Sequence, residues 1–440
     1  MTINDDLNIT SFQSKSSKNV SNLKSSFNRV LNPNNPTRRG IILFSITLLV
    51  HIIILLLIWF FYEMFGTNVL FLESIDREEL EEWRISDENL FVDRGEAVLH
   101  GKIPYKDFYL PTGPLMPYLY CFAPLMAMLT PIPVTYWFRF LFSFFNALTA
   151  WTIYQGFKTE GNEYEKWGYK AGYLYGLNPV IIFMALLWGT DETILAALFA
   201  LAAWQIKRKS WFWASFFIII CACAKYFSIF LLPFLLFTRP KIIEGIMVLI
   251  LNCLIILGTY ISFFFIAEEE TLVQFERYLF IAPLEKIEDQ GIWCFLETDG
   301  YFNIRIIPFP FYQILIIGLP LFLALWMVMS KRDAFTRMGA PGLLFTLLYS
   351  KFQLSYLLIG LWSLIGSIEI RERRVIPSIF LIIIPIILYG TVYLLFRDLR
   401  VNFILGFYFI LISCYLILLG LVLWKIFAKN VGFNEQIIND

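Results

Sequence analysis

Two lysines stand inside apolar stretches of the sequence, where a charged side chain needs a physical reason. Lys225 lies near the middle of about 27 residues between two basic clusters, and Lys351 occupies the same kind of position further along. A lysine at the centre of a membrane helix costs about 2.5–3.5 kcal/mol. Ionisable groups at that depth are therefore interpreted first as functional. The structural alternative is that the long lysine side chains reach up to the membrane surface.

Carboxylates beside apolar stretches form the second group of candidates. Four follow the first apolar stretch and two lie in a turn between two others, and the six are Asp87, Glu88, Asp93, Asp107, Asp191 and Glu192. A carboxylate can remove the proton of an attacking hydroxyl group, and an ammonium group stabilises a phosphate. The combination favours base chemistry beside an anion such as a lipid-linked phosphate. Asp87 and the two acids of the turn could instead cap helices, and Asp107 could be a turn residue.

The composition of the 440-residue chain is that of a membrane protein. Hydrophobic residues make up 58% of it and charged residues only 16%, whereas soluble domains carry about 25% charged residues. These values exclude a soluble enzyme and a disordered protein. Basic and acidic residues number 35 each, so the chain has no basic excess with which to bind nucleic acid. We therefore expect an all-α, polytopic bundle of transmembrane helices in the lipid bilayer.

Charge asymmetry predicts how the chain is organised across the membrane. The N-terminal region is basic and rich in Ser and Asn, and the positive-inside rule keeps it in the cytoplasm as a disordered tail. Two acidic loops are expected on the outer side. The predicted parts are a tail at 1–39, a membrane domain at 40–430 with outer loops at 66–113 and 267–304, and a tail at 431–440, with both termini cytoplasmic.

About twelve crossings and one partial segment are expected to position the candidate residues. Residues 114–130 are apolar but short and interrupted by prolines, and we expect them not to cross. Residues 168–188 and 191–206 form a hairpin whose acidic turn faces outward. Around Lys225 both flanks are basic, which favours two short helices meeting at the lysine, whereas a single long helix would put one basic end outside. The stretch around Lys351 repeats this design.

Short motifs accompany these residues in a defined order along the chain. They are Asp87-Glu88-Asn89-Leu90-Phe91 with Asp93, Gly101-Lys102-Ile103-Pro104-Tyr105, Asn178-Pro179 with Gly189-Thr190-Asp191-Glu192, Ala224-Lys225-Tyr226, and Ser350-Lys351 with Ser355-Tyr356. Together they resemble the GT-C class of membrane glycosyltransferases over most of residues 41–370. The resemblance is closest to the first mannosyltransferase of GPI-anchor assembly and to related prokaryotic polyprenyl-phosphate-sugar transferases.

The resemblance implies a transferase that moves a sugar, with mannose favoured, from a polyprenyl-phosphate donor to a hydroxyl group of a glycan or glycolipid at the outer membrane face. It implies catalytic roles for Asp87, as the base, and for Glu88 and Asp191. It implies substrate contacts by a larger set, namely Asp93, Tyr105, Asp107, Glu192, Lys225, Lys351 and Tyr356. Such an enzyme would lie in the cell membrane of a prokaryote or the endoplasmic reticulum of a eukaryote.

Metal dependence stays open at this point. A divalent ion, Mg²⁺ or Mn²⁺, would lie at Asp87 and Asp191, but Ile85 stands where the mannosyltransferase has a further aspartate. The chain has no CxxC motif, and His51 and His100 are its only histidines, which argues against a zinc site.

Two other classes of protein remain open. A transporter or a lipid-linked-sugar flippase would also carry intramembrane charges and helices broken at matching places in two halves, although the long acidic loop after the first span has no partner in the second half. A non-catalytic scaffold subunit would tolerate Asp87→Asn. The sequence contains neither the HExxH motif nor the GxSxG motif of common hydrolases.

Overall fold

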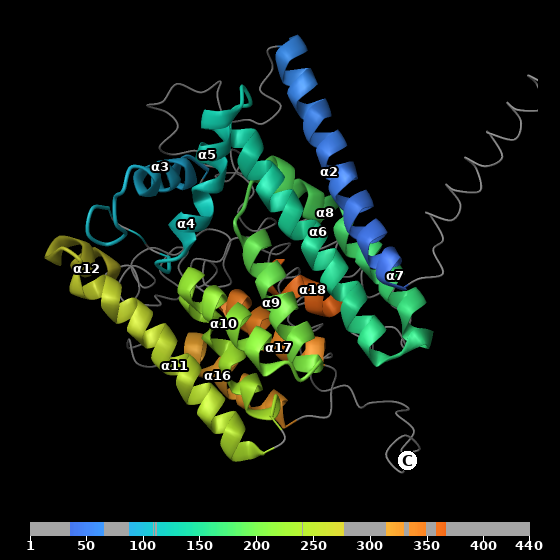
Figure 1. Ribbon diagram of the computed structural model, residues 1–440, viewed down its shortest axis with the longest axis vertical. Coiled ribbons are helices and arrows are strands. Elements are labelled where there is room, and N and C mark those ends of the chain that lie inside the picture. The colour runs from blue at the N-terminus through green and yellow to red at the C-terminus, as the bar shows by residue number, and fades with distance from the viewer. Residues whose placement is uncertain are drawn as a thin grey trace, which may run out of the picture.

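The computed structural model describes residues 36–65, 88–108, 110, 112–239, 241–276, 314–329, 334–348 and 358–366, and over these residues the protein is helical (Figure 1). The predicted all-α class is confirmed for this part of the chain. Three of the predicted site residues, Asp87, Lys351 and Tyr356, lie outside the described residues.

Two helices are long and apolar enough to cross a membrane. They are α2 (Pro36–Phe65), with its apolar part at Arg38–Phe60, and α11 (Ile242–Phe265), which has 24 residues. At 1.5 Å per residue, 24 residues measure about 36 Å, which exceeds the hydrocarbon thickness of about 30 Å. Both helices leave large apolar side chains exposed along their length, and they flank the bundle on opposite sides in Figure 1.

A third candidate span is a broken helix. In it α7 (Asn162–Gly176) is followed by α8 (Pro179–Phe183) and the π-helix η1 (Met184–Trp188), with a bend of 43° at the break. The break lies just before Pro179, whose backbone nitrogen has no hydrogen to donate. Two or three helices of the described residues are thus long and apolar enough to span a membrane, which indicates a membrane protein.

The long helix α6 (Val134–Glu160) lies in the middle of the bundle and packs against α2, α7 and α9 (Figure 1). Buried polar contacts fasten one end of it. The Tyr154 hydroxyl donates to Glu165 Oε1 at 2.7 Å, and the Arg39 guanidinium lies 3.3 Å from the same oxygen. One carboxylate of α7 therefore ties α2 and α6 together.

Short helices gather at the other end of α6. They are α3 (Glu88–Leu99), α4 (Met116–Tyr120) and α5 (Phe122–Leu129), which pack on one another and on the first turns of α6. With five and eight residues, α4 and α5 together measure about 20 Å and are too short to cross a bilayer. This length agrees with the prediction that residues 114–130 do not cross. A further short helix, α12 (Glu269–Glu276), follows α11.

The stretch around Lys225 folds as two short helices. After α9 (Glu192–Lys207) come α10 (Trp211–Ala224) and the 3₁₀ helix η2 (Tyr226–Phe237), and the backbone of Lys225 between them is extended. The start of α10 and the residues just after η2 lie close together, as the Arg239 guanidinium is 5.3 Å from the centre of the Trp211 ring. This contact confirms the prediction of two short helices, with the lysine at the tip of a hairpin.

A second pair of described helices also packs as a hairpin. The helices α17 (Ala334–Leu348) and α18 (Leu358–Ile365) follow η6 (Ile314–Gly318) and α16 (Leu319–Val328). Phe335 at the start of α17 contacts Trp362 near the end of α18, with ring centres 5.3 Å apart. The two hairpins touch each other through Phe230 and Phe345, whose ring centres are 5.1 Å apart.

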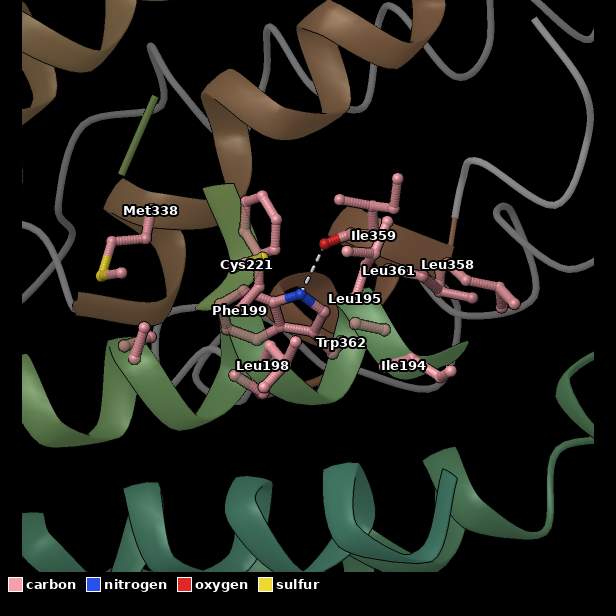
Figure 2. Close-up of a cluster of buried hydrophobic side chains, with 14 of the residues drawn as sticks. Ile194, Leu195, Leu198, Phe199, Cys221, Met338, Leu358, Ile359, Leu361 and Trp362 are labelled. Atoms are coloured by element: carbon pink, nitrogen blue, oxygen red, sulfur yellow. Dashed lines mark hydrogen bonds between the residues drawn. The ribbon is translucent and has the colours of Figure 1, made fainter. Parts of the chain in front are cut away.

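The hydrophobic core lies where α9 meets both hairpins. Figure 2 shows Trp362 of α18 among Leu195, Leu198 and Phe199 of α9, with its indole N–H donating to the Ile359 carbonyl at 2.6 Å. Every residue from 191 to 203 is buried. The first turn of α9 is therefore held rigidly by packing on all sides, and this is the turn that carries two of the predicted acids.

Candidate functional site

Lys225 lies against two carboxylates at the tip of its hairpin. Its Nζ is 3.0 Å from Asp191 Oδ1 and 2.6 Å from Glu192 Oε1. All three residues are buried, with exposed fractions of 4–6%. The structure thus brings together three of the predicted site residues, which we call the acid–lysine cluster.

The local sequence explains why both acids start α9. Gly189 has φ of 69°, a left-handed conformation that ends η1 and that glycine adopts without strain. The Thr190 hydroxyl donates to Glu192 Oε2. Asp191 directly precedes the helix and Glu192 is its first residue, a position where the helix dipole favours negative charge.

Tyr120 of α4 binds the second oxygen of Asp191. Its hydroxyl donates to Asp191 Oδ2 at 2.6 Å, and its ring stacks on Phe91 of α3 with ring centres 4.7 Å apart. Tyr120 is fully buried. Sequence reasoning missed this residue, because a tyrosine among apolar residues gives no signal that differs from core packing.

The loop between α3 and α4 pairs with the backbone beside the lysine. Gly113 N–H donates to the Ala224 carbonyl at 2.8 Å, and Leu115 N–H donates to the Cys223 carbonyl at 3.0 Å. A Cβ atom on Gly113 would lie only 2.1 Å from the Cys223 oxygen, so a larger residue does not fit. The extended backbone at the hairpin tip therefore has a strand-like partner from the predicted outer loop.

All four carboxylate oxygens of the cluster accept hydrogen bonds from protein groups. Two carboxylates share one ammonium group, so the cluster carries one net negative charge when every group has its ordinary ionisation. An uncompensated buried charge is strongly unfavourable, and Lys225 is what allows both acids to stay in the interior. The arrangement holds the acids in fixed orientations, as a site that orients a hydroxyl group requires.

The carboxylate of Asp191, a predicted metal ligand, lies directly beside the ammonium group of Lys225. One of its oxygens accepts a hydrogen bond from the ammonium group of Lys225 and the other accepts one from the hydroxyl of Tyr120. The positive charge of Lys225 would repel a divalent cation at the same carboxylate. Within the ranges that the structure describes, no three His, Cys, Asp or Glu side chains form a group that could hold a metal.

The other predicted acids lie on the surface or begin a helix. Asp93 is exposed on α3, and Asp107 is exposed and accepts a hydrogen bond from Ile103 N–H at 2.7 Å. That contact matches the alternative in which Asp107 is a turn residue. Glu88 is the first residue of α3. The structure does not bring Asp93 or Asp107 into the acid–lysine cluster, and their roles in substrate binding stay predictions.

Tyr105 anchors the predicted outer loop. It is fully buried, its φ is 67°, and its hydroxyl donates to the Thr112 carbonyl. Its ring packs on Phe263 and Phe264 at the end of α11, with ring centres 6.4 and 5.5 Å away. The described contacts of Tyr105 thus join the loop to the long helix, and its predicted contact with substrate remains a prediction.

A histidine and an arginine are also fully buried in the described part of the bundle, and sequence reasoning did not select them as site residues. They are His51 of α2 and Arg139 of α6. A usable signal existed for Arg139, because it interrupts an apolar stretch just as Lys225 does.

The described residues define a class of protein: a helical membrane protein with a buried acid–lysine cluster at the tip of a hairpin. Comparison with models of protein families and with curated protein sequences finds no match to the chain.

Proposed function

We propose that the protein is a GT-C-type membrane glycosyltransferase that moves a sugar, with mannose as the first choice, from a polyprenyl-phosphate donor to a hydroxyl group of a glycan or glycolipid. In this proposal about twelve membrane segments form the bundle, and the loop at 66–113, which includes α3, lies on the outer face. The observation that carries the proposal is the acid–lysine cluster, buried where α4, the helix that follows that loop, packs against the bundle.

The proposed reaction needs a base and a stabilised leaving group. The acceptor oxygen attacks the anomeric carbon, the bond from that carbon to the phosphate oxygen breaks with its electron pair going to the phosphate, and the hydroxyl proton passes to a carboxylate. Asp87 is the proposed base. It stands four residues before Phe91, which stacks on Tyr120, and four residues span at most about 14 Å. In the sequence it directly precedes α3, the helix that carries this stacking contact.

Lys225 is proposed to stabilise the phosphate of the donor. Because its ammonium group contacts two carboxylates, the lipid phosphate would replace one of them when the donor binds. Asp191 and Glu192 would orient the acceptor. Lys351 and Tyr356 are proposed to contact the donor from the second hairpin, as the motif resemblance implies.

A transfer assay in membrane vesicles tests the proposal. Vesicles holding the full-length protein receive a panel of radiolabelled polyprenyl-phosphate sugars and lipid acceptors, and the mass of the product is measured. We expect Asp87→Asn to abolish transfer while the protein stays folded in the membrane, and we expect the exposed control Glu96→Gln to retain activity. Unchanged turnover of the Asn variant would remove Asp87 from the role of base. Absence of any product with the wild-type protein would refute the proposal.

The role of Lys225 has a separate kinetic test. Lys225→Ala should raise the KM for the lipid-phosphate donor more than the KM for the acceptor, since only the donor carries the anion. Equal effects on both values would indicate a purely structural role for this lysine.

Transport of a lipid-linked sugar is the second candidate function, and the pair of hairpins favours it. Hairpins of matching design that touch through Phe230 and Phe345 are the kind of repeated broken element that many transporters use. The same vesicles distinguish the candidates. A transporter moves the labelled lipid across the bilayer with its mass unchanged, whereas a transferase produces a new covalent product.

A further inference from the structure

The acidic turn follows the broken span made of α7, α8 and η1. Regular helix is interrupted twice here, once at the break within the span and once where η1 ends before α9. One interruption follows Gly176 and the other follows Trp188. Inside a bilayer, a helix break leaves carbonyl groups without their N–H partners, and this is unfavourable unless another donor reaches them. The donors at the two breaks therefore determine how firmly the turn is held.

At the first break, the Gly176 carbonyl loses its helical donor. The N–H one turn further on belongs to Val180, and it donates to Asn178 Oδ1 at 2.9 Å instead. His51 of α2 forms the hydrogen bond to this carbonyl in its place, with Nε2 at 2.9 Å from the Gly176 oxygen. Because a carbonyl can only accept, Nε2 carries the hydrogen, and Nδ1 accepts from the Ser143 hydroxyl at 3.2 Å.

At the second break, the carbonyls of Leu186 and Leu187 face the same problem. Thr190 N–H donates to the Met184 carbonyl, the first of η1, at 3.3 Å. Glu192 N–H donates to the Thr190 hydroxyl at 3.4 Å. Arg139 Nη1 of α6 donates to both carbonyls, and its distance from the Leu187 oxygen is 3.2 Å. A positive charge at the C-terminal end of a helix is also favoured by the helix dipole.

We propose that His51 and Arg139 are positioning residues that cap the two breaks of this span, and that Arg139 thereby fixes the acidic turn of the acid–lysine cluster. Both side chains are fully buried and come from neighbouring helices. An apolar side chain would fill the same space without burying an ionisable group, so the donor function explains their chemistry better than packing does.

Hydrogen exchange of the full-length protein in lipid nanodiscs, followed by mass spectrometry, tests the proposal without any need for activity. Arg139→Met removes the donors, and Arg139→Lys keeps the charge without the planar fork. Thr152→Val is the matched control, because the buried hydroxyl of Thr152 lies on the same helix and donates to the Leu148 carbonyl of α6 itself. We expect exchange over residues 184–193 to rise by roughly tenfold or more in the Met variant, by less in the Lys variant, and not in the control.

The outcomes are distinct. An increase confined to the turn supports the proposal, whereas an even increase across α6, α7 and α9, or no increase, overturns it. Should the Met variant fail to fold, the Lys variant and the pair His51→Leu and His51→Gln decide the question. The Leu variant should raise exchange near residues 176–181, and the Gln variant, which keeps a donor, should raise it less.

A kinetic measurement extends the test and rests on the proposed function. Arg139→Lys should lower kcat by roughly tenfold and leave the KM for the donor nearly unchanged, since the turn is misplaced while the lipid contacts remain. A wild-type protein without transfer activity would refute the proposed function alone, and the exchange experiment would still decide whether these two residues act as caps.

Discussion

Replacing Tyr120 by phenylalanine removes one hydroxyl group and keeps the ring that stacks on Phe91. The lost hydrogen bond is 2.6 Å long and ends on Asp191. Tyr120 is fully buried and Asp191 is 4% exposed, so water does not replace the missing donor. A hydrogen bond to a charged group contributes about 1.5–3 kcal/mol, which is a factor of roughly 10 to 150 in the unfolding equilibrium. We expect the free energy of unfolding to fall by this amount.

A double-mutant cycle with Asp191→Asn isolates this interaction. Reversible unfolding in mixed detergent micelles gives the free energies of the four variants. Because the asparagine is uncharged, we expect Tyr120→Phe to lower stability by less than about 1 kcal/mol in that background. Tyr118→Phe is the matched control on the same helix, since Tyr118 is 45% exposed and its loss should stay within about 0.5 kcal/mol. Equal losses for Tyr120→Phe in both backgrounds would refute the reasoning.

Three other perturbations have definite expected results. Lys225→Met leaves two buried carboxylates without their cation and should lower the free energy of unfolding by about 3–5 kcal/mol, and addition of Glu192→Gln should restore part of that loss. Gly113→Ala brings a Cβ to 2.1 Å from a backbone oxygen and should lower stability by about 1–3 kcal/mol, measured by thermal unfolding. Ser210→Cys and Lys241→Cys flank the first hairpin and should react with an impermeant thiol reagent from the same side of sealed vesicles.

Each of these results has a control or a contradicting outcome. Lys166 is exposed, and Lys166→Met should leave stability within about 0.5 kcal/mol; a comparable loss would contradict the account of the cluster. At Gly258 an added Cβ meets nothing within 4 Å, so Gly258→Ala controls for Gly113→Ala. Labelling of positions 210 and 241 from opposite sides would rule out the hairpin.

Charge patterning made the hairpin around Lys225 predictable. Basic residues at both flanks, Lys209 and Arg239, favoured two short helices over a single long one, and the contact of Arg239 with Trp211 agrees with that reasoning. The meeting of Asp191 with Lys225 was also within reach of the sequence, because both were assigned to the same face of the membrane. For these residues the physical signal is strong, since a buried charge needs a partner.

The rest of the site depends on tertiary contacts that leave no periodic signal. Gly113 pairs with backbone atoms more than 100 positions away, and Tyr120 resembles any core aromatic residue until its acceptor is known. Arg139 was visible as a charge in an apolar stretch, yet its acceptors are backbone carbonyls exposed by a helix break. No pattern of side chains predicts such a contact.

The hairpin formed by α10 and η2 returns to the surface from which it starts, because Trp211 and Arg239 meet at its base. The hairpin therefore does not change the side of the membrane on which the later segments emerge. Deleting or duplicating such a unit would leave the orientation of all downstream segments intact. An architecture of this kind can gain or lose inner elements during evolution without inverting the remainder of the polypeptide.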